Sequence, residues 1–155
     1  MTMVAIGEMA PKFLGVTDGG GVVALKDLSG KKVILYFYPK DMTPGCTTEA
    51  ENFRDEADQF ERIDAIIIGV SKDSVRRHEN FKEKHNLPFS LISDVSGEIC
   101  EAYGVWKKKK NYGREYMGIV RSTFLIDPEG KISRIWEKVR VKGHVAEVLE
   151  ATRAL

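Results

Sequence analysis

The chain has 155 residues, of which 43% are hydrophobic and 30% charged, and its formal net charge at pH 7 is +1. This composition excludes disordered and fibrous proteins, and the length predicts a single domain over residues 1–155. A net charge so close to zero gives no general attraction to nucleic acid, and no apolar run approaches the ~18 residues of a membrane span. Since the first residues also lack the pattern of a secretion signal, we expect a cytoplasmic protein that does not enter membranes.

The first predicted elements are a hairpin, a buried strand and a helix. Two short apolar stretches, 13–17 and 22–25, flank a glycine-rich turn and predict a β-hairpin. Residues 33–38 are a continuous run of strand formers closed by Pro39, which is typical of a central strand buried on both faces. After a loop, apolar residues recur every three or four positions from 47 to 63, which predicts one amphipathic helix.

The rest of the chain continues the alternation of strands and helices. The expected strands are 65–70, 89–92, 122–127 and 131–137, and the expected helices are 74–85, 97–103 and 143–155. A βαβ unit followed by a hairpin and a terminal helix predicts an α/β protein with a mixed central sheet flanked by helices. This is the plan of a thioredoxin-like fold, here with an N-terminal β-hairpin.

The chain contains two cysteines, and their surroundings differ. Cys46 and Cys100 are too few and too far apart for a zinc site, a C-x-x-C pair or a disulfide framework. Cys46 follows the strand 33–38 and stands at the start of the next helix. Reaction sites in open α/β sheets gather at the carboxyl ends of strands, and a helix amino terminus favours a thiolate over a thiol. We therefore expect Cys46 to react as a thiolate nucleophile.

The residues around Cys46 resemble those of a known enzyme family. The segment Pro39-Lys40-Asp41-Met42-Thr43-Pro44-Gly45-Cys46-Thr47 is similar to the peroxidatic loop P-x-x-x-T-x-x-C of peroxiredoxins, and its Thr-Pro-Gly-Cys-Thr form resembles the bacterioferritin-comigratory-protein or PrxQ subfamily. The likeness extends nearly from end to end, through residues 10–13, 28–31, 103–106 and 120–127. It implies a thiol-dependent peroxidase that acts on hydrogen peroxide or organic hydroperoxides, and the sequence contains no cofactor motif.

The resemblance also implies roles for the residues of the loop. Cys46 would attack one peroxide oxygen and become a sulfenic acid. Thr43 would direct its hydroxyl at the peroxide and the thiolate, and Pro39 would shield the sulfur from water. Backbone N–H groups at Gly45 and Cys46 would donate hydrogen bonds to the peroxide oxygens as charge moves onto them.

Two charged residues complete the implied site. Arg121 would hold the thiolate and polarise the peroxide, a task suited to a permanent charge with several donors. Glu49 would orient Arg121 through a charge-assisted hydrogen bond. Each residue taken singly has a plain structural interpretation, in which Pro39 ends a strand, Thr43 caps a helix and the two charges are solvated. The combination in the family's spacing favours the catalytic interpretation.

Two routes are open for reducing the sulfenic acid back to the thiol. Many members of this subfamily carry a resolving cysteine five residues after the first, where this chain has Glu51, or in the next long helix, where residues 74–85 contain none. Cys100 could pair with Cys46 only if their Cα atoms came within about 7 Å. We therefore expect a buried structural Cys100 and a one-cysteine cycle, in which thioredoxin, glutaredoxin or a small thiol reduces Cys46. A Cys46–Cys100 disulfide reduced by thioredoxin is the alternative.

The remaining features predict no further site. The lysine run 107–110 is expected to be a solvated loop rather than a nucleic-acid surface. His78, His85 and His144 are scattered without other ligand types at metal-binding spacing, so no metal site is predicted. The rival function is a non-enzymatic peroxide sensor, in which oxidised Cys46 signals to a partner protein. The subfamily resemblance implies a monomer.

Overall fold

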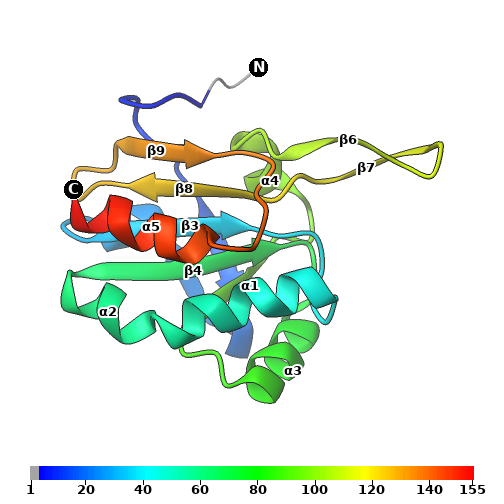
Figure 1. The fold of residues 1–155 in the computed structure, drawn as a ribbon, viewed down its shortest axis with the longest axis horizontal. Helices are drawn as coiled ribbons and strands as arrows, with labels where there is room; N and C mark the ends of the chain where they lie inside the picture. Colours follow the sequence, from blue (N-terminus) through cyan, green and yellow to red (C-terminus); the bar gives the residue numbers. More distant parts are fainter. Residues whose placement is uncertain (1–3) are drawn as a thin grey trace.

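The computed structural model describes residues 4–155, whose main body is a seven-stranded mixed sheet in the order β2-β1-β5-β4-β3-β8-β9 (Figure 1). Its strands are β1 (Leu14–Thr17), β2 (Val22–Ala24), β3 (Lys32–Phe37), β4 (Ala65–Ser71), β5 (Ser90–Ser93), β8 (Ser122–Ile126) and β9 (Ile132–Trp136). Strands β3, β4 and β5 run parallel, whereas β8 pairs antiparallel with β3 and the β1–β2 hairpin pairs antiparallel with β5. The predicted mixed sheet and N-terminal hairpin are confirmed.

Helices cover both faces of this sheet. They are α1 (Pro44–Asp55), α2 (Ala57–Arg62), α3 (Val75–His85), α4 (Glu98–Ala102) and α5 (His144–Arg153), with short 3₁₀ turns η1 (Asp18–Gly20) and η2 (Leu25–Leu28). Helices α1, α2, α3 and α5 contribute to one hydrophobic cluster, and α4 contributes to a second. Among the described residues, no helix is long and apolar enough to span a membrane.

Strand β3 supplies side chains to both clusters in strict alternation. Ile34 and Tyr36 belong to the cluster that contains α1, whereas Val33, Leu35 and Phe37 belong to the cluster that contains α4. All five are at most 1% exposed, and each such burial stabilises the fold by about 1.5–3 kcal/mol. Successive side chains of a strand point to opposite faces, so a run that is apolar throughout indicates a sheet covered on both sides. The strand that leads to Cys46 is therefore firmly fixed.

The prediction of one helix over residues 47–63 is wrong, because the chain bends at Glu56 between α1 and α2. Glu56 has φ −105° and ψ 5°, and its N–H donates to the carbonyl of Phe53, which closes the first helix. The bend still leaves Phe53 and Phe60 packed together, with ring centroids 6.1 Å apart. The apolar spacing continues through the bend, so periodicity could not reveal it.

The prediction of a loop at residues 107–110 is also wrong, although Lys107, Lys108 and Lys110 are exposed as expected. These lysines lie in β6 (Trp106–Asn111), which pairs antiparallel with β7 (Arg114–Ile119). The turn residues Tyr112 and Gly113 have φ of 52° and 78°, as a two-residue hairpin turn requires to match the strand twist. Figure 1 shows this ribbon reaching out from the body of the protein.

Candidate active site

Cys46 lies in the first turn of α1, just beyond the carboxyl end of β3. Thr43 is the N-cap residue, with φ −88° and ψ 151°, and Pro44 is the first helical residue. Proline suits that position because the N–H there has no helical partner. The first intrahelical bond runs from the N–H of Thr47 to the carbonyl of Thr43 at 2.9 Å. The N–H groups of Gly45 and Cys46 precede it, and groups at this position have no carbonyl partner in the helix.

Arg121 brings a positive charge to the sulfur from the start of β8. Its Nη2 donates to Cys46 Sγ at 3.4 Å, and its Nη1 donates to Glu49 Oε1 at 2.7 Å. A Cβ atom added at Gly45 would stand 3.2 Å from Nη2, so a larger residue there would press on the guanidinium. The structure thus joins Cys46, Gly45, Glu49 and Arg121 in one group, although Arg121 lies 75 positions from Cys46.

Burial sets the electrostatics of the Glu49–Arg121 pair. Glu49 is 0% exposed, and its Oε2 has no hydrogen-bond partner among the described residues. Burial raises the pKa of Glu49 to about 7, against the opposing effect of Arg121. Burial alone would lower the pKa of Arg121, but Glu49 and Cys46 raise it above its ordinary value. The arginine therefore stays charged while the carboxyl titrates near neutral pH.

Replacing Glu49 with glutamine is expected to change how stability depends on pH. A carboxyl with a pKa of about 7 when folded and ~4.3 when unfolded binds more protons in the folded state between these values. Its contribution is therefore complete below pH ~4 and is lost as the pH rises to about 7, which amounts to about 4 kcal/mol. Urea unfolding at pH 5 and pH 8 should show this loss in the wild type and a flatter profile in Glu49→Gln. A Glu61→Gln control, at an exposed glutamate on α2, should keep the wild-type slope, and an equal slope in Glu49→Gln would contradict the assignment.

Thr43 and Pro39 both lie in the loop of residues 39–46, named here the Cys46 loop. Thr43 Oγ1 donates to the carbonyl of Lys40 at 2.7 Å and makes no capping bond to the helix. The oxygen of a hydroxyl that donates in this way keeps its capacity to accept. Pro39 is half-buried at the entrance to the loop.

Cys100 is not part of this group. It is 0% exposed in α4 and belongs to the hydrophobic cluster on one face of the sheet, whereas Cys46 belongs to the cluster on the other face. Burial raises the pKa of the Cys100 thiol well above its ordinary value, and the carboxylate of Asp94 adds to the effect. Both cysteines are free thiols, and the central sheet separates them.

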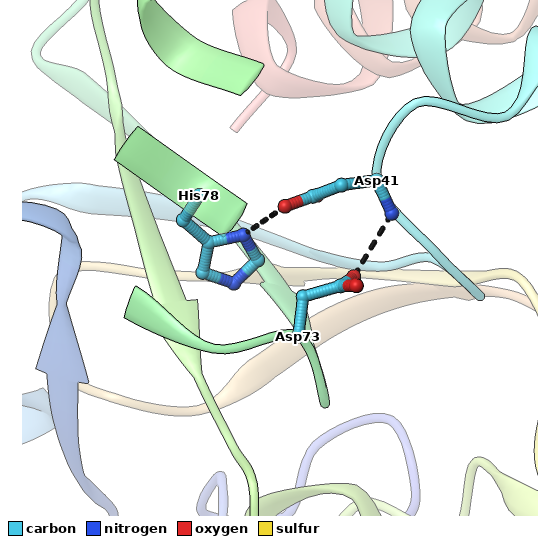
Figure 2. Close-up of side chains that lie close together, drawn as sticks. All are labelled: Asp41, Asp73 and His78. Atoms are coloured by element: carbon cyan, nitrogen blue, oxygen red, sulfur yellow. Dashed lines mark hydrogen bonds and ion pairs between the residues drawn. The ribbon is translucent and has the colours of Figure 1, made fainter. Parts of the chain in front are cut away.

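Asp41 of the Cys46 loop forms a buried cluster with Asp73 and His78 that the sequence analysis missed (Figure 2). His78 Nδ1 and Asp41 Oδ2 are 2.6 Å apart, and the N–H of Asp41 donates to Asp73 Oδ2 at 2.9 Å. These residue types bind metals, yet the atoms that face one another are already paired: His78 Nδ1 with Asp41 Oδ2, and Asp73 Oδ2 with the N–H of Asp41 and the hydroxyl of Ser71. The arrangement is that of a hydrogen-bond network.

Lys109 is a further residue whose place the sequence analysis missed. It is partly buried on β6, and its Nζ donates to the carbonyl of Ile119 at 3.0 Å. Its pKa is lowered by burial and by Arg121, while Cys46 raises it. Lys109 therefore lies close enough to the site to interact with both charges, unlike a solvated lysine.

Comparisons with known proteins identify the family. The model of the AhpC/TSA family matches residues 6–135. The Peroxiredoxin Bcp of Bacillus subtilis (strain 168) is 57% identical over 150 residues, which cover 97% of this chain and 96% of that protein. A cysteine-to-serine mutant of Xylella fastidiosa PrxQ has a TM-score of 0.93 at 39% identity, covering 99% of this chain and 98% of that one.

A second solved structure agrees with these matches. The Bacterioferritin Comigratory Protein of Xanthomonas campestris, studied for its alkyl peroxide reduction activity, has a TM-score of 0.88 at 40% identity and covers 99% of this chain and 98% of that one. The resemblance found in the sequence is confirmed, as is the thioredoxin-like fold. The chain therefore belongs to the AhpC/TSA family, among its Bcp/PrxQ peroxiredoxins, which are thiol-dependent peroxidases.

Proposed function

We propose that Cys46 reduces peroxides in a one-cysteine cycle and is regenerated by an external thiol. The observation that carries the proposal is the 3.4 Å contact from Arg121 Nη2 to Cys46 Sγ in the first turn of α1. A fixed positive charge beside a sulfur favours the thiolate, which is the nucleophilic form of cysteine. Membership of the peroxiredoxin family supports the choice of peroxide as the substrate.

The first half of the cycle follows from the groups around the sulfur. The thiolate attacks one peroxide oxygen, so that an S–O bond forms, the O–O bond breaks and its electron pair goes to the departing oxygen. That oxygen takes up a proton and leaves as water or an alcohol. The hydroxyl of Thr43, which donates to Lys40, can accept a hydrogen bond from the peroxide. Arg121 and the N–H groups of Gly45 and Cys46 stabilise the charge that develops on oxygen.

Glu49 and Pro39 act indirectly in this proposal. Glu49 accepts from Nη1 of Arg121 and so fixes one side of the planar guanidinium, which leaves Nη2 facing the sulfur. Pro39, with its restricted φ, holds the entrance of the loop and keeps water away from the thiolate.

Two observations support regeneration by an external thiol. Glu51, at the position where a resolving cysteine is common in the subfamily, lies near Arg54 and His85 in ion-pair geometry. Cys100 and Cys46 belong to clusters on opposite faces of the sheet, and a disulfide needs Cα atoms within about 7 Å. A Cys46–Cys100 disulfide would thus require large parts of the fold to open. Thioredoxin, glutaredoxin or a small thiol is the proposed reductant.

Removing the Cys100 thiol is expected to leave turnover unchanged. Steady-state peroxide consumption should be measured for wild type, Cys100→Ser and Cys100→Ala, with a thioredoxin system and with a small thiol. The alanine variant is included because it places no hydroxyl in the buried site. Mass spectrometry after one equivalent of peroxide should find the added oxygen on Cys46. Loss of thioredoxin-dependent turnover together with a Cys46–Cys100 cross-link in the wild type would establish the two-cysteine cycle instead. Sustained consumption also separates an enzyme from a sensor, which stops after one equivalent.

The proposal extends to substrates and assembly. Hydrogen peroxide and organic hydroperoxides are the proposed substrates, and the alkyl peroxide reduction studied in the Xanthomonas campestris relative supports the second class. A monomer with one domain over residues 1–155 is proposed from the subfamily likeness. The family match to residues 6–135 and the single main sheet support the domain assignment.

A further inference from the structure

Asp41 is held at each of its polar atoms. Its N–H donates to Asp73 Oδ2 at 2.9 Å, and its carbonyl accepts from Arg77 Nη2 at 3.4 Å. Its carboxylate accepts from the hydroxyl of Tyr38 at 2.6 Å through Oδ1 and pairs with His78 Nδ1 at 2.6 Å through Oδ2. Asp41 is 1% exposed and His78 is 0% exposed, so water does not compete for these bonds.

Most of the groups that hold Asp41 come from outside the Cys46 loop. Asp73 follows the end of β4, and His78 lies on α3, as Figure 2 shows. His78 is itself tied to β5, because its Nε2 donates to the carbonyl of Ile92 at 2.9 Å. A carbonyl oxygen only accepts, which fixes a hydrogen on Nε2. The network therefore fastens the loop to two neighbouring strands and a helix.

The backbone adopts an unusual conformation at Met42, directly after Asp41. Met42 has φ 67°, a left-handed conformation that a side chain of its size adopts only when its surroundings enforce it. Met42 is 41% exposed, so its own side chain supplies little of that constraint. The fixed Asp41 on one side and the N-cap Thr43 on the other supply it. The direction in which the chain enters α1, and hence the position of Cys46, thus depends on Asp41.

We propose that His78 and Asp73 are positioning residues for peroxide reduction. They hold Asp41 in place and thereby fix the positions of Thr43 and Cys46. The inference rests on the proposed function of Cys46. Neither residue touches the sulfur in the contacts described, and both act through the loop backbone. Because a misplacement of about 1 Å at reacting atoms can cost roughly 100-fold in rate, a loosened anchor should slow the reaction far more than it harms the fold.

Two substitutions of His78 separate its two hydrogen bonds. The side-chain nitrogen of asparagine can take the place of Nδ1 and keep the bond to Asp41, whereas that of glutamine can take the place of Nε2 and keep the bond to Ile92. We expect His78→Gln to lower the second-order rate constant for oxidation of Cys46 by hydrogen peroxide roughly 10- to 100-fold, and His78→Asn to restore most of it. Equal losses in the two variants, or wild-type rates in both, would overturn the proposal.

Labelling with a bulky maleimide gives a second measurement that needs no peroxide. Cys46 is 2% exposed and Cys100 is 0% exposed, so Cys46 reports on opening of its loop and Cys100 reports on opening of the whole fold. Peptide mass spectrometry should show faster labelling of Cys46 in His78→Gln, with Cys100 labelled at the wild-type rate. A parallel rise at both cysteines would mean general destabilisation and would refute the anchor. If peroxide did not oxidise Cys46 in the wild-type protein, the proposed function would be refuted. The labelling result would still decide whether the anchor exists.

Discussion

The Cys46→Ser variant is expected to lose peroxide turnover with every thiol reductant. A serine hydroxyl stays protonated beside a single arginine at ordinary pH, and its oxygen does not attack the O–O bond as a thiolate does. The loss should amount to roughly a thousandfold or more, as is typical when a covalent nucleophile is removed. Steady-state peroxide consumption measures it directly.

The same variant should fold normally. Serine is close to cysteine in size, and Arg121 keeps its bond to Glu49 at 2.7 Å when the sulfur is replaced. Circular dichroism and urea unfolding should therefore agree with the wild type. The matched control is Cys100→Ala, which should keep its activity. Turnover that survives in Cys46→Ser and disappears on adding Cys100→Ala would assign the nucleophile to Cys100.

Local patterns in the sequence predict the parts of this protein that local interactions determine. The strand at residues 33–38 is found because burial on two faces makes every position apolar. The place of Cys46 is found because it stands between the predicted strand 33–38 and the next predicted helix, at the carboxyl end of the strand. The contact of Arg121 with the sulfur spans 75 positions, and it was expected from the family resemblance alone, since no periodicity connects residues so distant.

Non-local hydrogen bonds form the buried polar cluster that the sequence analysis missed. Asp41, Asp73 and His78 look unrelated along the chain, yet Asp41 and Asp73 follow the neighbouring parallel strands β3 and β4. The carboxyl ends of such strands meet at one edge of a sheet, so polar residues after each of them were a usable signal. The pair Tyr112-Gly113 was likewise a turn signal for the β6–β7 hairpin, although lysine-rich residues give little indication of a strand.

The Cys46 loop is thus fixed by two buried acid–base pairs, one on each side of the nucleophile. Asp41 and His78 hold the chain before Cys46. Glu49 follows Cys46 on α1 and is paired with Arg121, which contacts the sulfur from the start of β8. The first pair has partners at all its facing atoms, whereas Glu49 Oε2 has none among residues 4–155. Burial raises the pKa of Glu49 to about 7, so the charge on the Arg121 side of the site changes near neutral pH.

Replacing Arg121 with alanine is accordingly expected to slow the oxidation of Cys46 by peroxide roughly 10²- to 10³-fold, the cost of losing one fixed donor to a developing oxyanion. Stopped-flow mixing with hydrogen peroxide, followed by the loss of the Cys46 thiol, measures this rate.

The substitution has a second consequence that the experiment must separate. Without Arg121, Glu49 is a buried carboxyl with no cation, and breaking such a pair costs about 3–5 kcal/mol unless the carboxyl takes up a proton. The double variant Arg121→Ala/Glu49→Gln removes that penalty, so its rate compared with Glu49→Gln isolates the catalytic effect of the arginine. Arg134→Ala, at a half-exposed arginine on β9, is the matched surface control and should react like the wild type. If Arg121→Ala and the double variant both react at wild-type rates, the guanidinium beside the sulfur has no part in the reaction, and the thiolate must be stabilised by the start of α1 alone.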